Sequence, residues 1–255
     1  MDKARRRTHI QVLDKMTDLI DDQHRIVEQR PFIVRATHTR MGRTMEESLD
    51  LFMGVYLDSL APDRRQLLMR YRIIDVARKV VGVGSVGTRC WVILFQGMDA
   101  GDPMFLQVKE AQASVLGAHL PAWPDEPPNQ GRRVVMGQRL IQGSPDIFLG
   151  WGEQDGVDFY VRQLRDMKGG IELEPGSATP AELIEYCALC GWALALAHAK
   201  SGDAATLSGY LGKSEVFDEA MVRFAAAYAD QTQRDYEALA AAAKRGEIEV
   251  APVSS

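Results

Sequence analysis

The chain has 255 residues, of which 46% are hydrophobic and 25% charged, and its formal net charge is -5 at pH 7. This composition is ordinary for a soluble globular protein, and it lacks the basic field of a nucleic-acid binder. No apolar run reaches the ~20 residues that a membrane span needs. The three cysteines argue against a disulfide framework and predict a reducing, cytoplasmic compartment.

The first third of the chain is predicted to be mainly helical. Apolar residues recur at helical spacing over residues 4–27, and residues 31–34 form a short extended piece. A Thr-x-x-Glu capping box opens a predicted helix over residues 44–60. A proline in the first turn suits another short helix over residues 62–71.

A glycine-rich loop is the most informative motif of the chain. Gly82, Gly84 and Gly87 form a G-x-G-x-x-G run with Ser85 at its tip. In a dinucleotide-binding fold such a run opens a helix. Here a β-branched and aromatic segment, residues 88–95, follows instead, and it predicts a strand.

Lys109 ends the next predicted strand, residues 104–109, after a turn at residues 98–103. Strand, glycine loop, strand, turn and strand with lysine is the arrangement with which protein kinases cover phosphates. The glycines allow backbone N–H groups to approach phosphate oxygens, and the lysine supplies a positive charge. The alternatives are a plain hairpin turn for the glycines and an exposed lysine at a strand end.

The second half of the chain is predicted to add a helix, a hairpin and two long helices. The helix covers residues 130–142, and a strand over residues 157–164 can pair with residues 146–151. A helix over residues 179–200 is apolar nearly all round and is therefore predicted to be buried. A final long helix is predicted over residues 215–245.

Two features near this apolar helix invite a functional interpretation. Cys187 and Cys190 form a C-x-x-C pair without a second pair of ligands, so they are predicted to be buried thiols on one helix face rather than a zinc site. His198 and Asp203 loosely resemble the helix and catalytic loop of aminoglycoside-type kinases. No asparagine follows Asp203 at the required spacing, so a histidine at the end of a helix is the simpler interpretation.

These elements predict an α+β fold with the two-lobe plan of kinase-like proteins. Residues 74–168 form a small antiparallel sheet with an inserted helix, and residues 169–255 form a helical lobe. Residues 1–73 are a helical segment that precedes the glycine loop and is assigned to the helical lobe. A helical block before the glycine loop departs from the usual order of kinase-like proteins.

Eight segments carry a resemblance to a known family: residues 3–8, 77–89, 108–111, 137–142, 146–151, 160–168, 197–203 and 228–232. On these segments the chain resembles, over essentially its whole length, an uncharacterised bacterial kinase-like family classed as a domain of unknown function. That family also has an earlier segment with a Gly-Asp-x-His-x-x-Asn motif and an Asp-Phe-Asp motif. Both motifs precede the glycine loop, so the resemblance implies a permuted kinase-like fold. This chain begins after them, so the resemblance implies a truncated product or a fragment that lacks the N-terminal catalytic segment and could be complemented by another polypeptide.

The resemblance implies an ATP-binding, phosphotransferase-type module that is incomplete without the upstream segment. Mg²⁺ would accompany the ATP, with its ligands outside this chain, and the acceptor would be a small molecule or a protein hydroxyl. The alternatives are a nucleotide-sensing pseudokinase or scaffold, and a fold that binds no nucleotide. In each case the missing segment is expected to leave an apolar face uncovered.

Eight residues are predicted to contact the nucleotide, and no catalytic residue or metal ligand is assigned. The glycine loop and Lys109 would hold phosphates, and Gln138 would orient Lys109 where kinases use a glutamate. Arg139 would pair with a phosphate or a carboxylate, and Gln163 lies where backbone groups of an interlobe hinge hold adenine. The complete set is Gly82, Gly84, Ser85, Gly87, Lys109, Gln138, Arg139 and Gln163.

Overall fold

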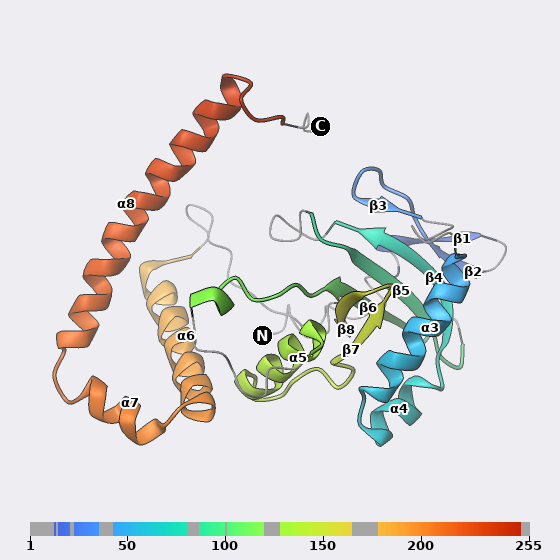
Figure 1. The fold of residues 1–255 in the computed structure, drawn as a ribbon, viewed down its shortest axis with the longest axis horizontal. Coiled ribbons are helices and arrows are strands. Elements are labelled where there is room, and N and C mark those ends of the chain that lie inside the picture. The colour runs from blue at the N-terminus through green and yellow to red at the C-terminus, as the bar shows by residue number, and fades with distance from the viewer. Residues whose placement is uncertain are drawn as a thin grey trace. The chain divides into compact units, whose positions relative to one another are not determined.

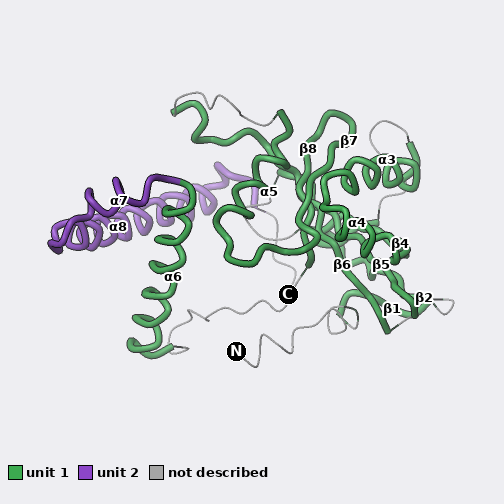
Figure 2. Tube along the Cα trace, turned by 90° about the horizontal axis from the view of Figure 1, so that it is seen from below, with its two compact units in different colours: residues 1–201 green, residues 202–255 purple. Residues whose placement is uncertain are grey.

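The structure is a computed structural model that describes residues 13, 15–20, 23–35, 43–80, 87–99, 101–119, 128–164 and 178–250. The chain divides into two compact units, Met1–Ser201 and Gly202–Ser255 (Figure 2). The first unit is built on an antiparallel sheet, and the second unit is helical. The fold is therefore a mixed α+β fold, as the sequence predicts.

The central sheet has six strands in the order β3-β4-β5-β6-β8-β7 (Figure 1), and every neighbouring pair is antiparallel. A separate hairpin is formed by β1 and β2. The strands are β1 (Thr17–Ile20), β2 (Gln23–Ile26), β3 (Ile33–Val34), β4 (Arg72–Lys79), β5 (Cys90–Gln96), β6 (Pro103–Glu110), β7 (Gly150–Gln154) and β8 (Val157–Gln163). The strands predicted over residues 88–95 and 104–109 are confirmed by β5 and β6. The hairpin predicted for residues 157–164 is also confirmed, but its partner strand β7 covers Gly150–Gln154 instead of residues 146–151.

The hairpin of β1 and β2 shows that the helix predicted over residues 4–27 is wrong from Thr17 to Ile26, although residues 13, 15 and 16 are helical. The hairpin is tied to β4 by two hydrogen bonds: the Ile26 N–H donates to Asp75 Oδ2 over 2.8 Å, and the Arg25 guanidinium donates to the Ile74 carbonyl over 2.9 Å. Apolar spacing in a short segment fits a helix or a strand pair, and tertiary contacts decide between them. Here the contacts with β4 favour the hairpin.

One face of the sheet, the helix face, is covered by α3 (Met45–Asp58) and α4 (Pro62–Leu68), as Figure 1 shows. The predicted capping box is confirmed, since Thr44 Oγ1 accepts from the Glu47 N–H over 3.2 Å and the Glu47 carboxylate accepts from the Thr44 N–H over 3.0 Å. The core of this face includes Phe52, Tyr56, Leu68, Ile93, Phe95, Leu106, Val108, Phe159 and Val161.

The opposite face, the hairpin face, has a second apolar cluster. Side chains of three strands, Ala77, Val92, Leu94 and Phe105, pack there with Leu13, Met16, Ile26 and Ile33. Because successive residues of a strand point to opposite faces, the buried run of β5 and β6 supplies both clusters. This explains why these two strands are apolar almost throughout.

Helix α5 (Gln130–Ile141) is inserted between β6 and β7, as predicted, and its first turn is fixed to β8. Asn129 caps the helix, and its amide nitrogen donates to Asp158 Oδ1 over 2.7 Å. The Gln130 N–H donates to Asp158 Oδ2, also over 2.7 Å. Gly131 lies against the carbonyl oxygen of Phe159 so closely that a β-carbon would overlap it. A short 3-10 helix, Gly117–His119, precedes α5 in the chain.

Helix α6 (Pro180–Ser201) forms where the sequence predicts it, but the prediction that it is buried is wrong. Ala197 is its one buried residue, while Ile184 is 70% and Trp192 is 62% exposed. An apolar composition shows that burial of the helix would be favourable in free energy. It does not show that another described part of the same chain covers the helix. By length and composition alone, α6 is the one described helix that could cross a membrane. Cys187 and Cys190 on this helix are free and exposed, so their predicted burial is also wrong.

The second unit contains α7 (Ala204–Leu211) and α8 (Val216–Lys244). The sequence predicts α8 but not α7, which begins after the cap residue Asp203. The Asp203 carboxylate accepts the N–H groups of Ala205 and Thr206 over 2.8 and 3.1 Å, and these bonds lower its pKa. Capping is thus the role that the structure gives to Asp203.

Candidate functional site

Four side chains form one row across the hairpin face. In the strand register, Cys90 of β5 lies opposite Lys109 of β6, Lys109 lies opposite Tyr160 of β8, and Tyr160 lies opposite Trp151 of β7. Residues that are directly opposite in antiparallel strands share a face and have neighbouring side chains. Cys90 is buried, and the other three side chains are half-buried.

A second cation lies beside this row. Arg162 is opposite the buried Gln107, and its Nε donates to Gln107 Oε1 over 3.3 Å. Since Gln107 precedes Lys109 by two residues, Arg162 and Lys109 are diagonal neighbours on one face. Among the described residues, no acidic side chain forms an ion pair with Lys109 or Arg162. We call Lys109, Arg162, Tyr160, Cys90 and Gln107 the Lys109 site.

The electrostatics of the Lys109 site favour an anion. Burial lowers the pKa of Lys109 below its ordinary value, and the positive charge of Arg162 lowers it further. Burial raises the pKa of Tyr160, although Arg162 opposes the shift, and burial also raises the pKa of the Cys90 thiol. The native fold therefore holds two positive charges close together, which is unfavourable in electrostatic free energy. A bound anion would offset this repulsion.

The end of the glycine loop is fixed beside Lys109. Gly87 has a φ of 85°, which a residue with a side chain rarely adopts, and β5 begins shortly after it. The Glu110 N–H donates to the Arg89 carbonyl over 2.9 Å, and the Arg89 N–H donates to Glu110 Oε2 over 3.0 Å. These bonds hold the loop exit at the end of β6. The predicted loop residues Gly82, Gly84 and Ser85 lie outside the described residues.

Arg139 lies near the other end of the row. The guanidinium carbons of Arg132 and Arg139 are each 5.8 Å from the centre of the Trp151 ring, and Arg139 also donates to the Leu149 carbonyl over 2.7 Å. Cations at this distance are attracted to the face of an indole. The structure therefore brings Arg139 and Lys109 to one face of the sheet, with Tyr160 and Trp151 between them. Arg132 was not predicted, although its seven-residue spacing from Arg139 places both arginines on one side of a helix.

The two predicted glutamines are placed differently. Gln138 is half-buried on α5, and in the described structure it donates no hydrogen bond to Lys109. The Gln163 N–H donates to the Asp146 carboxylate, and the Leu164 N–H donates to the Phe105 carbonyl over 2.9 Å. Both N–H groups at this end of β8 are therefore bonded within the protein. Asp146 was missed as a site-shaping residue, and an acidic residue before a strand gives no specific sequence signal.

No metal-binding group stands out in the described part of the chain, where no three His, Cys, Asp or Glu side chains lie close enough to share an ion. What the Lys109 site can do chemically is bind an anionic group with Lys109 and Arg162 as donors. The half-buried rings of Tyr160 and Trp151 extend this surface along the row.

Comparison with known proteins gives one match. A family model described as an uncharacterized protein conserved in bacteria (DUF2252) matches residues 1–242. No curated protein and no solved structure shows significant similarity to this chain.

Proposed function

The chain belongs to this bacterial family, DUF2252, whose description states no activity, and we propose that it binds ATP through the Lys109 site as a kinase-like, phosphotransferase-type module. Lys109 and Arg162 hold phosphate oxygens in this proposal, and the glycine loop covers them with backbone N–H groups. Mg²⁺ accompanies the triphosphate, and the acceptor is a hydroxyl of a small molecule or a protein.

The observation that carries the proposal is a pair of half-buried cations without an acidic partner among the described residues, next to the exit of a glycine-rich loop. Solvent-exposed lysines are usually free or paired with surface carboxylates, and they keep an ordinary pKa. Lys109 instead has a lowered pKa and a second cation beside it. A phosphate group supplies the negative charge that this arrangement lacks.

The order of the elements supports the kinase-like part of the proposal. Strands β4, β5 and β6 form a meander with the glycine loop after the first strand and Lys109 in the third. Helix α5 follows, and β8 returns to pair with β6. This is the order of the phosphate-covering lobe in protein kinases, with a strand lysine followed by a helix.

Binding without transfer is the second candidate function. Lys109 and Arg162 are sufficient to hold a triphosphate, whereas transfer also needs a carboxylate that holds Mg²⁺ and a group that orients the nucleophile. A nucleotide-sensing pseudokinase or scaffold would need the cations alone. The two functions therefore share the Lys109 site and differ in turnover.

The test is a titration with Mg²⁺-ATP, followed by thermal unfolding and calorimetry. ATP at about 100 times its Kd should stabilise the protein by about 2.7 kcal/mol and raise its Tm. Lys109→Met should abolish the shift, whereas Lys213→Met, at an exposed lysine of the second unit, should not. An unchanged ATP shift in Lys109→Met would remove Lys109 from the site.

Two further arms separate the alternatives. Tripolyphosphate should compete with ATP and adenosine should not, because the described contacts serve the phosphates. ADP release after addition of a separate polypeptide with the Gly-Asp-x-His-x-x-Asn segment would support a phosphotransferase. Binding without ADP release under these conditions would support the sensor.

A further inference from the structure

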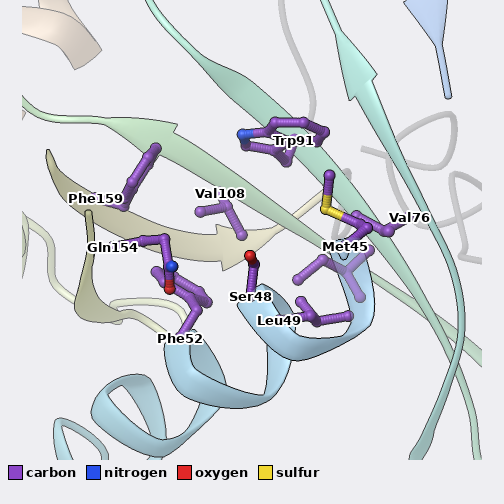
Figure 3. A pocket seen from close by; sticks show the side chains of 10 residues that line it. Met45, Ser48, Leu49, Phe52, Val76, Trp91, Val108, Gln154 and Phe159 are labelled. Atoms are coloured by element: carbon purple, nitrogen blue, oxygen red, sulfur yellow. The ribbon is translucent and has the colours of Figure 1, made fainter. Parts of the chain in front are cut away.

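A small cavity lies on the helix face, under the first half of α3. It has a volume of about 80 Å³, is half-enclosed, and is lined by ten residues, none of them charged (Figure 3). Met45 and Phe52 of α3 form one wall, and Trp91, Val108 and Phe159 of the sheet form the other. Ser48 and Gln154 contribute the polar side chains of this lining.

The hydroxyl group of Ser48 has no hydrogen-bond partner in the described structure, although Ser48 is only 4% exposed. Serine and threonine hydroxyls in helices can bond to the carbonyl four residues earlier. The exposed Ser201 and Thr232 do so in this chain, over 2.9 Å each. Figure 3 shows the Ser48 oxygen directed instead from α3 into the space beside Val108.

An unpartnered hydroxyl in an apolar cavity restricts the kind of ligand. An ionic group would be buried without a counter-charge, which is strongly unfavourable. One water could bond to both polar side chains of the wall, Ser48 and Gln154, which is the minimum of the two to four partners that a buried water needs. Further waters in the remaining volume would face apolar side chains, so water is a poor occupant of the cavity as a whole. An aliphatic group can make apolar contacts with the side chains of the wall. One hydroxyl or carbonyl oxygen on that group can form a hydrogen bond with the Ser48 hydroxyl.

We propose that this cavity binds the end of a neutral, mostly aliphatic molecule whose single hydroxyl or carbonyl group pairs with Ser48 Oγ. An apolar cavity of about 150 Å³ in another protein holds benzene. A volume of 80 Å³ therefore suits a short alkyl end of about four carbons, and the open side lets a longer molecule extend outward.

The cavity is separate from the Lys109 site. Val108 lines the cavity and Lys109 is the next residue of the same strand, so their side chains point to opposite faces of the sheet. Loss of ATP binding in a Lys109 variant would leave the cavity intact. The two proposals can therefore succeed or fail independently.

The test uses 1-butanol and xenon as probes of the intact chain, observed by methyl NMR. Millimolar 1-butanol should shift the methyl signals of Met45 and Val108 and give NOEs to both. Ser48→Ala should weaken 1-butanol binding about twofold to tenfold, the range of one neutral hydrogen bond, and should leave xenon binding unchanged or stronger. Ser208→Ala, at an exposed serine of α7, is the matched control and should change neither.

Two results would overturn the proposal. One is the absence of NOEs between 1-butanol and the cavity methyl groups in the wild-type chain. The other is an equal change of 1-butanol and xenon binding in Ser48→Ala, because this would show that the hydroxyl does not select the ligand. Retained methyl spectra in Ser48→Ala establish that the variant is folded.

Discussion

Lys109 shows how a single residue can be placed by pairing rather than by local sequence. Its neighbours on the sheet face come from β5, the preceding strand, and from β8, which follows α5 and β7 in the chain. The sequence predicts a lysine at a strand end, and the structure places Lys109 one residue before the end of β6. The sequence does not reveal that Arg162 lies on the same face, because the pairing partner of β6 is set by the return of the chain after α5.

Removal of the Lys109 charge should make the unliganded protein more stable at neutral pH. The pKa of Lys109 is lower in the folded state than its ordinary value of 10.5, so the unfolded chain binds the proton more tightly. At pH 7 both states are protonated, and the folded state carries the whole cost of the charge. Lys109→Met should therefore raise the free energy of unfolding at pH 7, and this gain should shrink as the pH rises toward 10.5. Urea denaturation at pH 7 and pH 10 measures it, and a loss of stability at pH 7 would contradict the assignment.

Phosphate binding should depend on the same proton. If Lys109 contacts a phosphate, ATP affinity should fall as the pH rises through the Lys109 pKa, which lies below 10.5. Lys109→Arg is the control, because arginine stays protonated throughout this range. Calorimetry between pH 7 and pH 10 should show a falling affinity for the wild type and a nearly constant affinity for the arginine variant. Equal slopes for both proteins would contradict the contact.

Among the elements, α5 shows what sequence signals can and cannot predict. Its cap and its extent follow from the sequence, as do those of α3 with its capping box. The close approach of Gly131 to β8 does not, because two glycines of α5 look equivalent in the sequence. The same limit explains why the helix prediction is wrong for the hairpin of β1 and β2, where contacts with β4 decide the local structure.

Substitution of alanine for each of the two glycines of α5 should change the stability of the protein in opposite directions. A β-carbon at Gly131 would overlap the Phe159 carbonyl, whereas a β-carbon at Gly137 meets no atom within 4 Å. Gly131→Ala should destabilise the sheet unit by about 1–3 kcal/mol through overpacking. Gly137→Ala should stabilise it by about 0.5–1 kcal/mol, because alanine loses less backbone entropy in a helix. Guanidinium denaturation measures both, and the same sign for both variants would contradict the placement of α5.

At the scale of the whole molecule, the large apolar surface of α6 is the main departure from the sequence-based expectation. The apolar composition of α6 predicts that the helix is buried. Burial also requires a surface that packs against the helix, and composition does not show whether such a surface exists. Leu189 and Trp192 are 59% and 62% exposed and lie one turn apart on the same side of α6.

The isolated chain should therefore associate with itself through α6. Sedimentation at micromolar concentrations should show oligomers, and the dye ANS should bind, because exposed apolar patches of this kind promote association. The double variant Leu189→Glu, Trp192→Glu should shift the chain toward a monomer without a change in circular dichroism. Glu185→Gln, at a polar position of the same helix, is the control and should not. A monodisperse wild-type monomer at high concentration would contradict this prediction.

The row from Cys90 to Trp151 has a practical consequence for how the protein can be dissected. Its members come from four neighbouring strands of the sheet, with α5 between β6 and β7 in the chain. No peptide that covers a single strand can reproduce the row, and a protease cut followed by release of either half would dismantle it. A fragment that keeps this row intact must therefore retain everything from the entry of β5 to the exit of β8, with α5 included.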